Sequence, residues 1–236
     1  MTNYFKIYGQ LRTGTNYIST ILETNFLDTK VFMNVGGWKH GKIIEIPNEK
    51  ELVNTIDGHT KNKINVSETI NLFKKNTVKF IVMIKNPYMW INSICNCSNK
   101  SVKDSSFIIE QIKIWNTLYA NYKQHIESKK AYLIRYENLI QDSDSVLEDL
   151  IKEFNLKRKF ENSFKLETKK LLANSDATLG KCCSEDFDKT KYINPNINKF
   201  LPRNIMKIIN NNIDFRLMDF YNYDIVWPGH WWCADE

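Results

Sequence analysis

Two glycines five residues apart frame the stretch of the sequence whose residues could bind a phosphate. Gly9 closes a short run of aromatic and β-branched residues, and Gly14 precedes a helical pattern of apolar residues. This is the glycine spacing of a phosphate-binding P-loop. The backbone amides of Gly14, Thr15 and Asn16 would lie at a helix N-terminus, where the macrodipole attracts anions. With the positive charge of Arg12, the stretch predicts a P-loop-like phosphate-binding turn.

The turn differs from that of ATP- and GTP-binding proteins. Those proteins have Lys and then Ser or Thr directly after the second glycine, whereas this chain has Thr15 and Asn16 there. They also hold magnesium through an acidic residue at the end of a neighbouring strand, but the expected strand 78–84 is followed by Lys85. A cation at that place suits a second phosphate, so we expect no metal. A P-loop kinase and an ordinary βα turn both stay open on the glycine spacing alone.

Three stretches resemble motifs of sulfotransferases that use 3′-phosphoadenylyl sulfate (PAPS). Residues 11–17 (LRTGTNY) resemble the loop that binds the 5′-phosphosulfate. Residues 80–93 resemble the 3′-phosphate motif, with a strand that ends at Lys85-Asn-Pro and with Ser93 eight residues beyond the lysine. Residues 132–139 (YLIRYENL) resemble the late strand and turn of the same enzymes. The three motifs occur in the family's order and cover most of the chain.

The resemblance assigns residues to both ends of the donor. Arg12 would act on the charge that develops on the leaving phosphate, and so it counts as catalytic as well as donor-binding. Lys85 replaces the arginine that is usual in the family, and lysine binds phosphate as a point charge instead of a bidentate fork. A basic loop over residues 179–192 would fold over the nucleotide or simply be solvated. The implied donor-binding residues are Arg12, Thr13, Gly14, Thr15, Asn16, Lys85, Ser93 and Lys191, with Lys181 and Lys189 as further candidates.

Transfer to a hydroxyl needs a general base near the sulfur. In the family this base is a His or Glu on the segments after the first helix, and the resemblance therefore points to the glycine-flanked residues 36–41 (GGWKHG). His40 is the candidate base because its ordinary pKa, about 6.5, suits proton abstraction near neutral pH. Lys39 would steady the bridging oxygen or the sulfonyl group. Glu45 and His59 are the fallbacks, and a purely structural turn with an exposed histidine is the alternative.

These residues need a sheet whose strands end at one edge. Strand, turn and helix alternate at least three times, which predicts an α/β fold, a three-layer sandwich with a central parallel sheet and right-handed crossovers. Proline at position 87 should open a helix, and the aromatic stripe from 108 to 126 indicates a helix packed on the core. Residues 145–148 (SVLE) form a capping box that should begin another helix. The expected strands cover about 4–8, 30–34, 78–84 and 131–135.

Length and composition set the remaining expectations. The 236 residues, 42% of them hydrophobic, predict a single sulfotransferase-like domain over 1–236. The net charge of +6 favours anionic ligands, but its lysines are dispersed, so nucleic acid is not expected as a partner. Five cysteines without metal-site spacing indicate thiols in a reducing compartment. No apolar run approaches the roughly 20 residues of a membrane span, and a first strand from about Tyr4 leaves no room for a signal peptide, so we expect a cytoplasmic protein.

Taken together, the residues and the resemblance predict an enzyme, a PAPS-dependent sulfotransferase. It would move a sulfuryl group to a hydroxyl or amine of a saccharide or small-molecule acceptor, without a metal, and release adenosine 3′,5′-bisphosphate. The alternatives are a P-loop kinase of a nucleotide or small molecule, and a nucleotide-binding relative that has lost turnover. The Trp-rich tail after residue 226 would pack either on the domain or on another subunit. In the second case the protein would be a homo-oligomer.

Overall fold

A computed structural model describes residues 2–32, 35–48, 66–98, 100–101, 104–166 and 201–227. Helices and strands alternate through the first two thirds of the chain, as the sequence predicts, and two further helices follow near its end. The elements are β1 (Asn3–Gly9), α1 (Thr15–Asn25), β2 (Thr29–Phe32), α3 (Val66–Lys74), β3 (Val78–Ile84), α4 (Pro87–Cys97), α5 (Ser105–Glu127), β4 (Ala131–Arg135), α6 (Tyr136–Gln141), α7 (Ser143–Phe154), α9 (Arg203–Asn212) and α10 (Phe215–Phe220).

The four strands of the described residues form one parallel sheet in the order β2-β1-β3-β4. The chain moves from β1 to β2 on one side and then returns to pair β3 with the other side of β1. This reversal is a topological switch point, and ligands of open α/β sheets bind beyond the carboxyl ends of the strands there. Gly9 at the end of β1 lies opposite Met83 in β3. The turn after β1 and Lys85 after β3 therefore emerge at the same edge.

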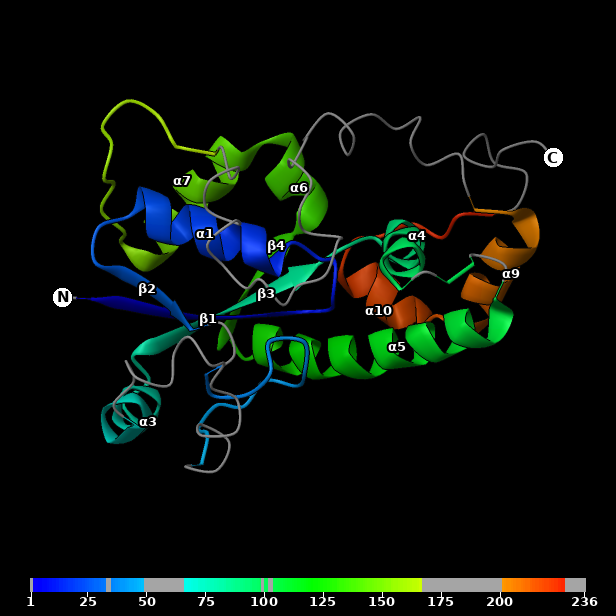
Figure 1. Cartoon of the computed structure of the whole chain (residues 1–236), viewed down its shortest axis with the longest axis horizontal. Coiled ribbons are helices and arrows are strands. Elements are labelled where there is room, and N and C mark those ends of the chain that lie inside the picture. Colours follow the sequence, from blue (N-terminus) through cyan, green and yellow to red (C-terminus); the bar gives the residue numbers. More distant parts are fainter. Residues whose placement is uncertain are drawn as a thin grey trace.

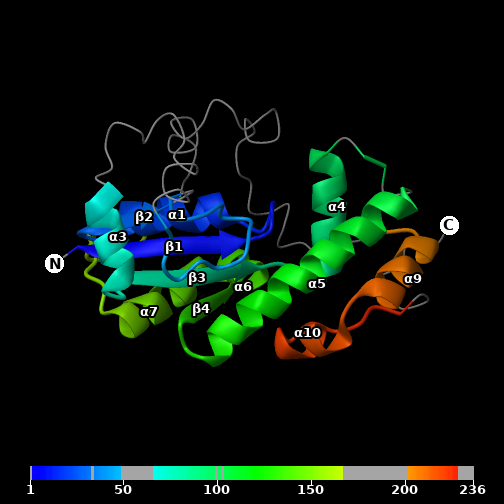
Figure 2. The same cartoon turned by 90° about the horizontal axis from the view of Figure 1, so that it is seen from below.

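Helices cover both faces of the sheet, which confirms the predicted α/β fold with a central parallel sheet. α1, α6 and α7 lie on one face, and α5 crosses the other (Figures 1 and 2). The alternation of side chains along each strand produces the two apolar layers. In β3, for example, Ile81 and Met83 join the core under α1 and α7, while Val82 and Ile84 join the core under α5.

The start of α7 differs from the sequence prediction. The capping box at 145–148 predicted Ser145 as the N-cap, and that prediction was wrong. Asp142 caps the helix instead, because its carboxylate accepts a hydrogen bond from the Ser145 amide at 3.0 Å and so already satisfies a terminal N–H. Glu148, the expected reciprocal partner, pairs with Arg158.

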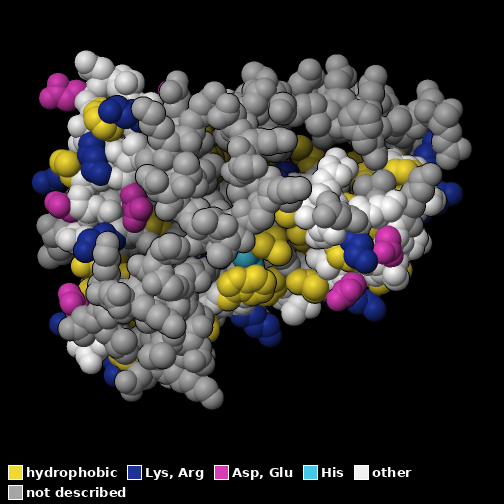
Figure 3. Space-filling view, in the orientation of Figure 1, with side chains coloured by type: hydrophobic (Ala, Val, Ile, Leu, Met, Phe, Trp, Pro, Cys, Tyr) yellow, Lys and Arg dark blue, Asp and Glu magenta, His cyan; other side chains and the backbone are white. Residues whose placement is uncertain are grey.

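The tail, the number of domains, a membrane span and the distribution of charge were further expectations from the sequence. The tail beyond Trp227 lies outside them, and the single-domain prediction stays a prediction. No helix among the described residues combines the length and the apolar character that crossing a bilayer requires. On the face seen in Figure 3, the described Lys and Arg side chains are scattered among Asp and Glu and do not form one stripe.

The capping assignment predicts a difference between two alanine substitutions. Asp142→Ala should lower the free energy of unfolding by about 1 kcal/mol, because an N–H at the start of α7 loses its acceptor. Ser145→Ala, the matched control, should change it by less than about 0.5 kcal/mol, since the hydroxyl is at an exposed helical position. Urea denaturation of the three proteins measures both values, and a larger loss for Ser145→Ala would contradict the assignment.

Candidate functional site

The turn between β1 and α1 leaves the start of α1 open to an anion. Gly14 is the N-cap of α1 in the left-handed region, with φ of 86°, and no side chain caps the helix. Within the turn, Thr13 donates to the carbonyl oxygen of Gln10 from its hydroxyl at 2.7 Å and from its amide at 3.2 Å. The first turn of α1 contains no acidic residue. The amides of Thr15 and Asn16 therefore lie where the helix dipole favours a negative charge.

Glycine at position 14 is required for two reasons. Its backbone conformation is one that residues with a Cβ rarely adopt. A Cβ built there would lie 2.7 Å from Cδ2 of Tyr136, the first residue of α6. The ring of Tyr136 thus packs directly against the turn, and it joins two of the motifs that the sequence shows far apart.

α4 places a second set of side chains beside this turn. Pro87 occupies the first helical position, and the side chain of Asn86 caps the helix by accepting from the Tyr88 amide at 3.0 Å. One turn further along, Trp90 donates from Nε1 to the carbonyl oxygen of Leu11 at 2.8 Å. The helix that follows β3 therefore supports the turn that follows β1.

The same helix brings Ser93 to the basic residue of the turn. Nε of Arg12 lies 3.5 Å from Oγ of Ser93. Arg12 is also close enough to Lys85 to lower the pKa of that lysine by charge repulsion. The structure thus brings together Arg12, Lys85 and Ser93, which the sequence analysis assigned to opposite ends of one donor. The residues predicted for the two phosphates therefore lie close to each other at this edge of the sheet.

Lys85 is almost completely buried, with 2% of its surface exposed. Its Nζ lies over the ring of Tyr136, 4.4 Å from the centroid. Burial lowers the pKa of Lys85 to about 8, with Glu137 opposing this shift and Arg12 adding to it. A buried ammonium next to a second cation is costly, and such an arrangement is typical of a place that receives an anion.

The loop after β2 brings Lys39 and His40 to the same edge. Both are buried. Nζ of Lys39 donates to Oδ1 of Asn16 at 2.6 Å, so this ammonium lies at the first turn of α1. The carbonyl oxygen of Lys39 accepts from the Gly9 amide at 3.0 Å, and Nδ1 of His40 lies 2.6 Å from the Gly9 carbonyl oxygen. The predicted pair therefore contacts Gly9, before the turn, and Asn16, after it.

The contact with Gly9 fixes the tautomer of His40. A carbonyl oxygen can only accept, so Nδ1 carries the proton and Nε2 keeps a lone pair in the neutral ring. Burial lowers the pKa of His40 to about 4, with Lys39 and Lys6 adding to the shift and the Gly9 hydrogen bond opposing it. The exposed histidine of the structural alternative was a wrong expectation, because His40 is buried. The ordinary pKa for which His40 was chosen as the base was a wrong expectation as well. In this state His40 is a neutral imidazole that can accept a proton.

Buried polar side chains of the sheet and of α5 hold the 36–41 loop in place. Lys6 in β1 is fully buried and donates from Nζ to the Gly37 carbonyl oxygen at 2.6 Å. Tyr122 in α5 donates from its hydroxyl to the Gly41 carbonyl oxygen at 2.7 Å. The sequence analysis missed Lys6, although a lysine inside an apolar strand is a signal that could have indicated it. Trp38 alone among these loop side chains is strongly exposed, at 55%, with its ring edge-on to His40.

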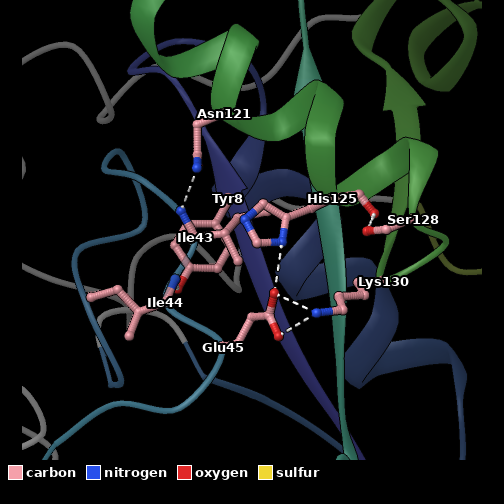
Figure 4. A network of polar contacts seen from close by, with 8 residues as sticks. All are labelled: Tyr8, Ile43, Ile44, Glu45, Asn121, His125, Ser128 and Lys130. Atoms are coloured by element: carbon pink, nitrogen blue, oxygen red, sulfur yellow. Dashed lines mark hydrogen bonds and ion pairs between the residues drawn. The ribbon is translucent and has the colours of Figure 1, made fainter.

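The segment that follows this loop runs along α5 and ends in an ion cluster. Figure 4 shows Asn121 accepting from the Ile43 amide and Glu45 between His125 and Lys130. Glu45 lies 2.7 Å from Nζ of Lys130, the residue before β4, and 3.3 Å from Nδ1 of His125. Glu45, a fallback base in the sequence analysis, is therefore engaged by two basic side chains at the amino end of β4 rather than at the carboxyl edge.

Four of the predicted residues cannot be placed, because the structure does not describe them. His59, Lys181, Lys189 and Lys191 lie outside the described residues. Within the described ranges, no group of three or more His, Cys, Asp or Glu side chains is arranged to hold a metal ion.

Solved structures with a similar fold are found at low sequence identity. The chain resembles the sulfotransferase domain of the olefin synthase from Synechococcus PCC 7002, with a TM-score of 0.52, 11% identity and 96% of each chain covered. It also aligns with the sulfotransferase domain of the curacin biosynthetic pathway (TM-score 0.48, 13% identity, 95% of this chain and 99% of the other) and with a sulfotransferase from Alicyclobacillus acidocaldarius (0.42, 11%, 95% and 97%). No family model matches the sequence, and no curated protein is similar to it.

The burial of His40 predicts how stability depends on pH. Its pKa of about 4 in the folded chain lies below the ordinary 6.5, so the unfolded chain binds the proton more readily between these values. Stability that is present above about pH 6.5 is then lost as the pH falls towards 4, by up to about 3 kcal/mol from this group.

His40→Asn should remove that part of the acid loss, because the amide can still donate to Gly9 but does not titrate. Urea denaturation of both proteins between pH 7 and pH 4 measures the difference. Parallel losses in the two proteins would show that His40 does not contribute.

Proposed function

Because the chain has the sulfotransferase fold, we propose that it moves a sulfuryl group from PAPS to a hydroxyl or amine of a saccharide or small-molecule acceptor. The observation that carries the proposal is the convergence of Arg12, Lys85 and Ser93 beside the uncapped start of α1. PAPS has a phosphosulfate at its 5′ end and a phosphate at its 3′ end. Cations beside the start of α1 and after β3, at one switch point, suit a donor with a phosphate at each end.

The proposed roles follow the geometry of the turn. The amides of Gly14, Thr15 and Asn16 would hold the 5′-phosphosulfate at the helix N-terminus. Arg12 would help to hold the same 5′-phosphosulfate, and Lys85 and Ser93 would hold the 3′-phosphate. Lys39, hydrogen-bonded to Asn16, would be close to the leaving phosphate.

The reaction in this proposal is a single displacement at sulfur. The acceptor oxygen forms a bond to sulfur while the bond between sulfur and the oxygen of the 5′-phosphate breaks. The products are the sulfated acceptor and adenosine 3′,5′-bisphosphate. Negative charge develops on the leaving phosphate, where Arg12, Lys39 and the backbone amides would stabilise it.

His40 would take the proton of the acceptor hydroxyl on Nε2. In the chain without ligand, Lys39 and Lys6 both lower the pKa of His40. A bound donor brings negative charge close to the same cations and acts in the opposite direction, so the proton affinity of His40 should rise when the donor is bound. The exposed ring of Trp38 next to His40 would then offer an apolar face to the acceptor.

Ligand-induced stabilisation tests the donor. Adenosine 3′,5′-bisphosphate in EDTA should raise the melting temperature by about 5 to 10 °C at about 100 times its Kd, because only the folded chain binds it. Arg12→Ala and Lys85→Ala should each reduce this shift. Lys129→Ala, the control, removes an exposed lysine that belongs to neither predicted phosphate position and should not reduce it. If ATP with magnesium stabilises the chain and adenosine 3′,5′-bisphosphate does not, the proposal is rejected in favour of a kinase.

Substitution of His40 tests the base. His40→Ala should bind adenosine 3′,5′-bisphosphate with little change in Kd but lower kcat by about 10²- to 10⁴-fold, the usual contribution of general base catalysis. Transfer of radiolabelled sulfate from PAPS to a panel of saccharides and phenols measures kcat, and calorimetry measures Kd. His125→Ala, a change at the ion cluster of Glu45, is the control and should keep kcat. An unchanged kcat in His40→Ala would refute the role.

A further inference from the structure

Glu137 joins the turn after β3 to the segment that follows α10. Its Oε1 accepts a hydrogen bond from the Asn86 amide at 2.8 Å, and its Oε2 accepts one from the hydroxyl of Tyr223 at 2.8 Å. Asn86 directly follows Lys85 and is the N-cap of α4. The carboxylate thus fixes the peptide that determines how Lys85 leaves the sheet. The sequence analysis quoted Glu137 only as part of a motif and gave it no role.

The charges around Lys85 come from two neighbouring segments. Among the described residues, the charged groups that act on Lys85 are Glu137, from α6, and Arg12, from the turn after β1. Tyr136 contributes its ring face. Tyr223, the other titratable group in contact with Glu137, stays neutral because burial and the neighbouring carboxylate raise its pKa well above the ordinary value. Glu137 is therefore the described negative charge that offsets the repulsion between Lys85 and Arg12.

We propose that Glu137 is a positioning residue that keeps Lys85 protonated and directed at the 3′-phosphate of the donor, so that donor binding depends on pH through Lys85. This rests on the proposed function. The dependence is specific to a lysine at this position, since an arginine keeps its charge throughout the accessible pH range. Glu137 itself does not touch the donor in this proposal and acts only through Lys85 and the Asn86 peptide.

The sign of the effect follows from linkage. The phosphate binds the charged form of Lys85, and the pKa of Lys85 in the free protein is about 8. Affinity should therefore be highest below about pH 8 and fall above it, to about one tenth of the pH 7 value at pH 9. The ligand's own phosphates do not confuse this range, because their second pKa is about 6. Removing the charge of Glu137 lowers the pKa of Lys85, so the fall should begin at a lower pH.

Calorimetric titration with adenosine 3′,5′-bisphosphate from pH 7 to pH 9.5 tests the proposal. Glu137→Gln is nearly isosteric, and its amide oxygen can still accept from the Asn86 amide. We expect it to bind about three- to tenfold more weakly than the unchanged chain at pH 8.5, and with a smaller difference at pH 7. Tyr223→Phe, the matched control, removes a hydrogen bond to Glu137 but keeps the carboxylate charge, and it should keep the pH profile of the unchanged chain.

Lys85→Arg completes the test and does not depend on how well Glu137→Gln folds. Its affinity should stay nearly constant across the range, and adding Glu137→Gln to it should produce no new pH dependence. A pH-independent loss in Glu137→Gln would mean a structural role only and would overturn the proposal. So would an equal fall in affinity for Lys85→Arg and the unchanged chain. Absence of binding by the unchanged chain at every pH would reject the proposed function itself.

Discussion

The gathering of like charges at one edge of the sheet constrains the rest of this structure. Arg12, Lys39 and Lys85 come from three different segments and meet beside the positive end of α1. Burial removes much of the hydration that would otherwise stabilise the two lysines, and Arg12 repels Lys85. Such an arrangement lowers the stability of the chain without ligand. A bound anion would offset this cost, and the cluster therefore supports the proposed donor site.

Contacts between distant segments hold the cations in place. The ring of Tyr136 lies against Gly14 and under Lys85, so α6 supports both the turn after β1 and the turn after β3. Trp90 in α4 supports the first of these turns from the other side through the Leu11 carbonyl. A turn with only local hydrogen bonds would adapt its shape to each ligand. Two helices fix this turn, and preorganised hydrogen-bond donors lose less free energy when a ligand binds.

The sequence was sufficient where local chemistry decides the structure. The aromatic and β-branched run before Gly9 and the apolar run before Lys85 both form the predicted parallel strands, and Pro87 opens α4 as expected. Prediction was less successful where several local solutions compete. Asp142 and Ser145 can both cap the start of α7, and the stronger acceptor three residues earlier is the one that does so.

The sequence could not predict the tertiary contacts, for a different reason. The hydrogen bond from Asn86 to Glu137 joins residues 51 positions apart, and that from Lys39 to Asn16 joins residues 23 apart. Spacing along the chain contains no information on such pairs until the strand order is known. The resemblance suggested which residues bind the donor, but the buried environment that alters the pKa of His40 and Lys85 is a property of the folded chain alone.

One residue, Gly9, links the two halves of the candidate site. The amide of Gly9 donates to the Lys39 carbonyl oxygen, and the carbonyl oxygen of Gly9 accepts from His40. Gly9 is also where β1 ends and the turn before α1 begins, and a Cβ there would lie 2.7 Å from the Met83 carbonyl oxygen in β3. The loop with the proposed base and the turn for the donor therefore cannot shift independently. In the proposed function, the contacts of Gly9 would therefore hold His40 at a fixed place relative to the bound donor, which is the positioning that transfer requires.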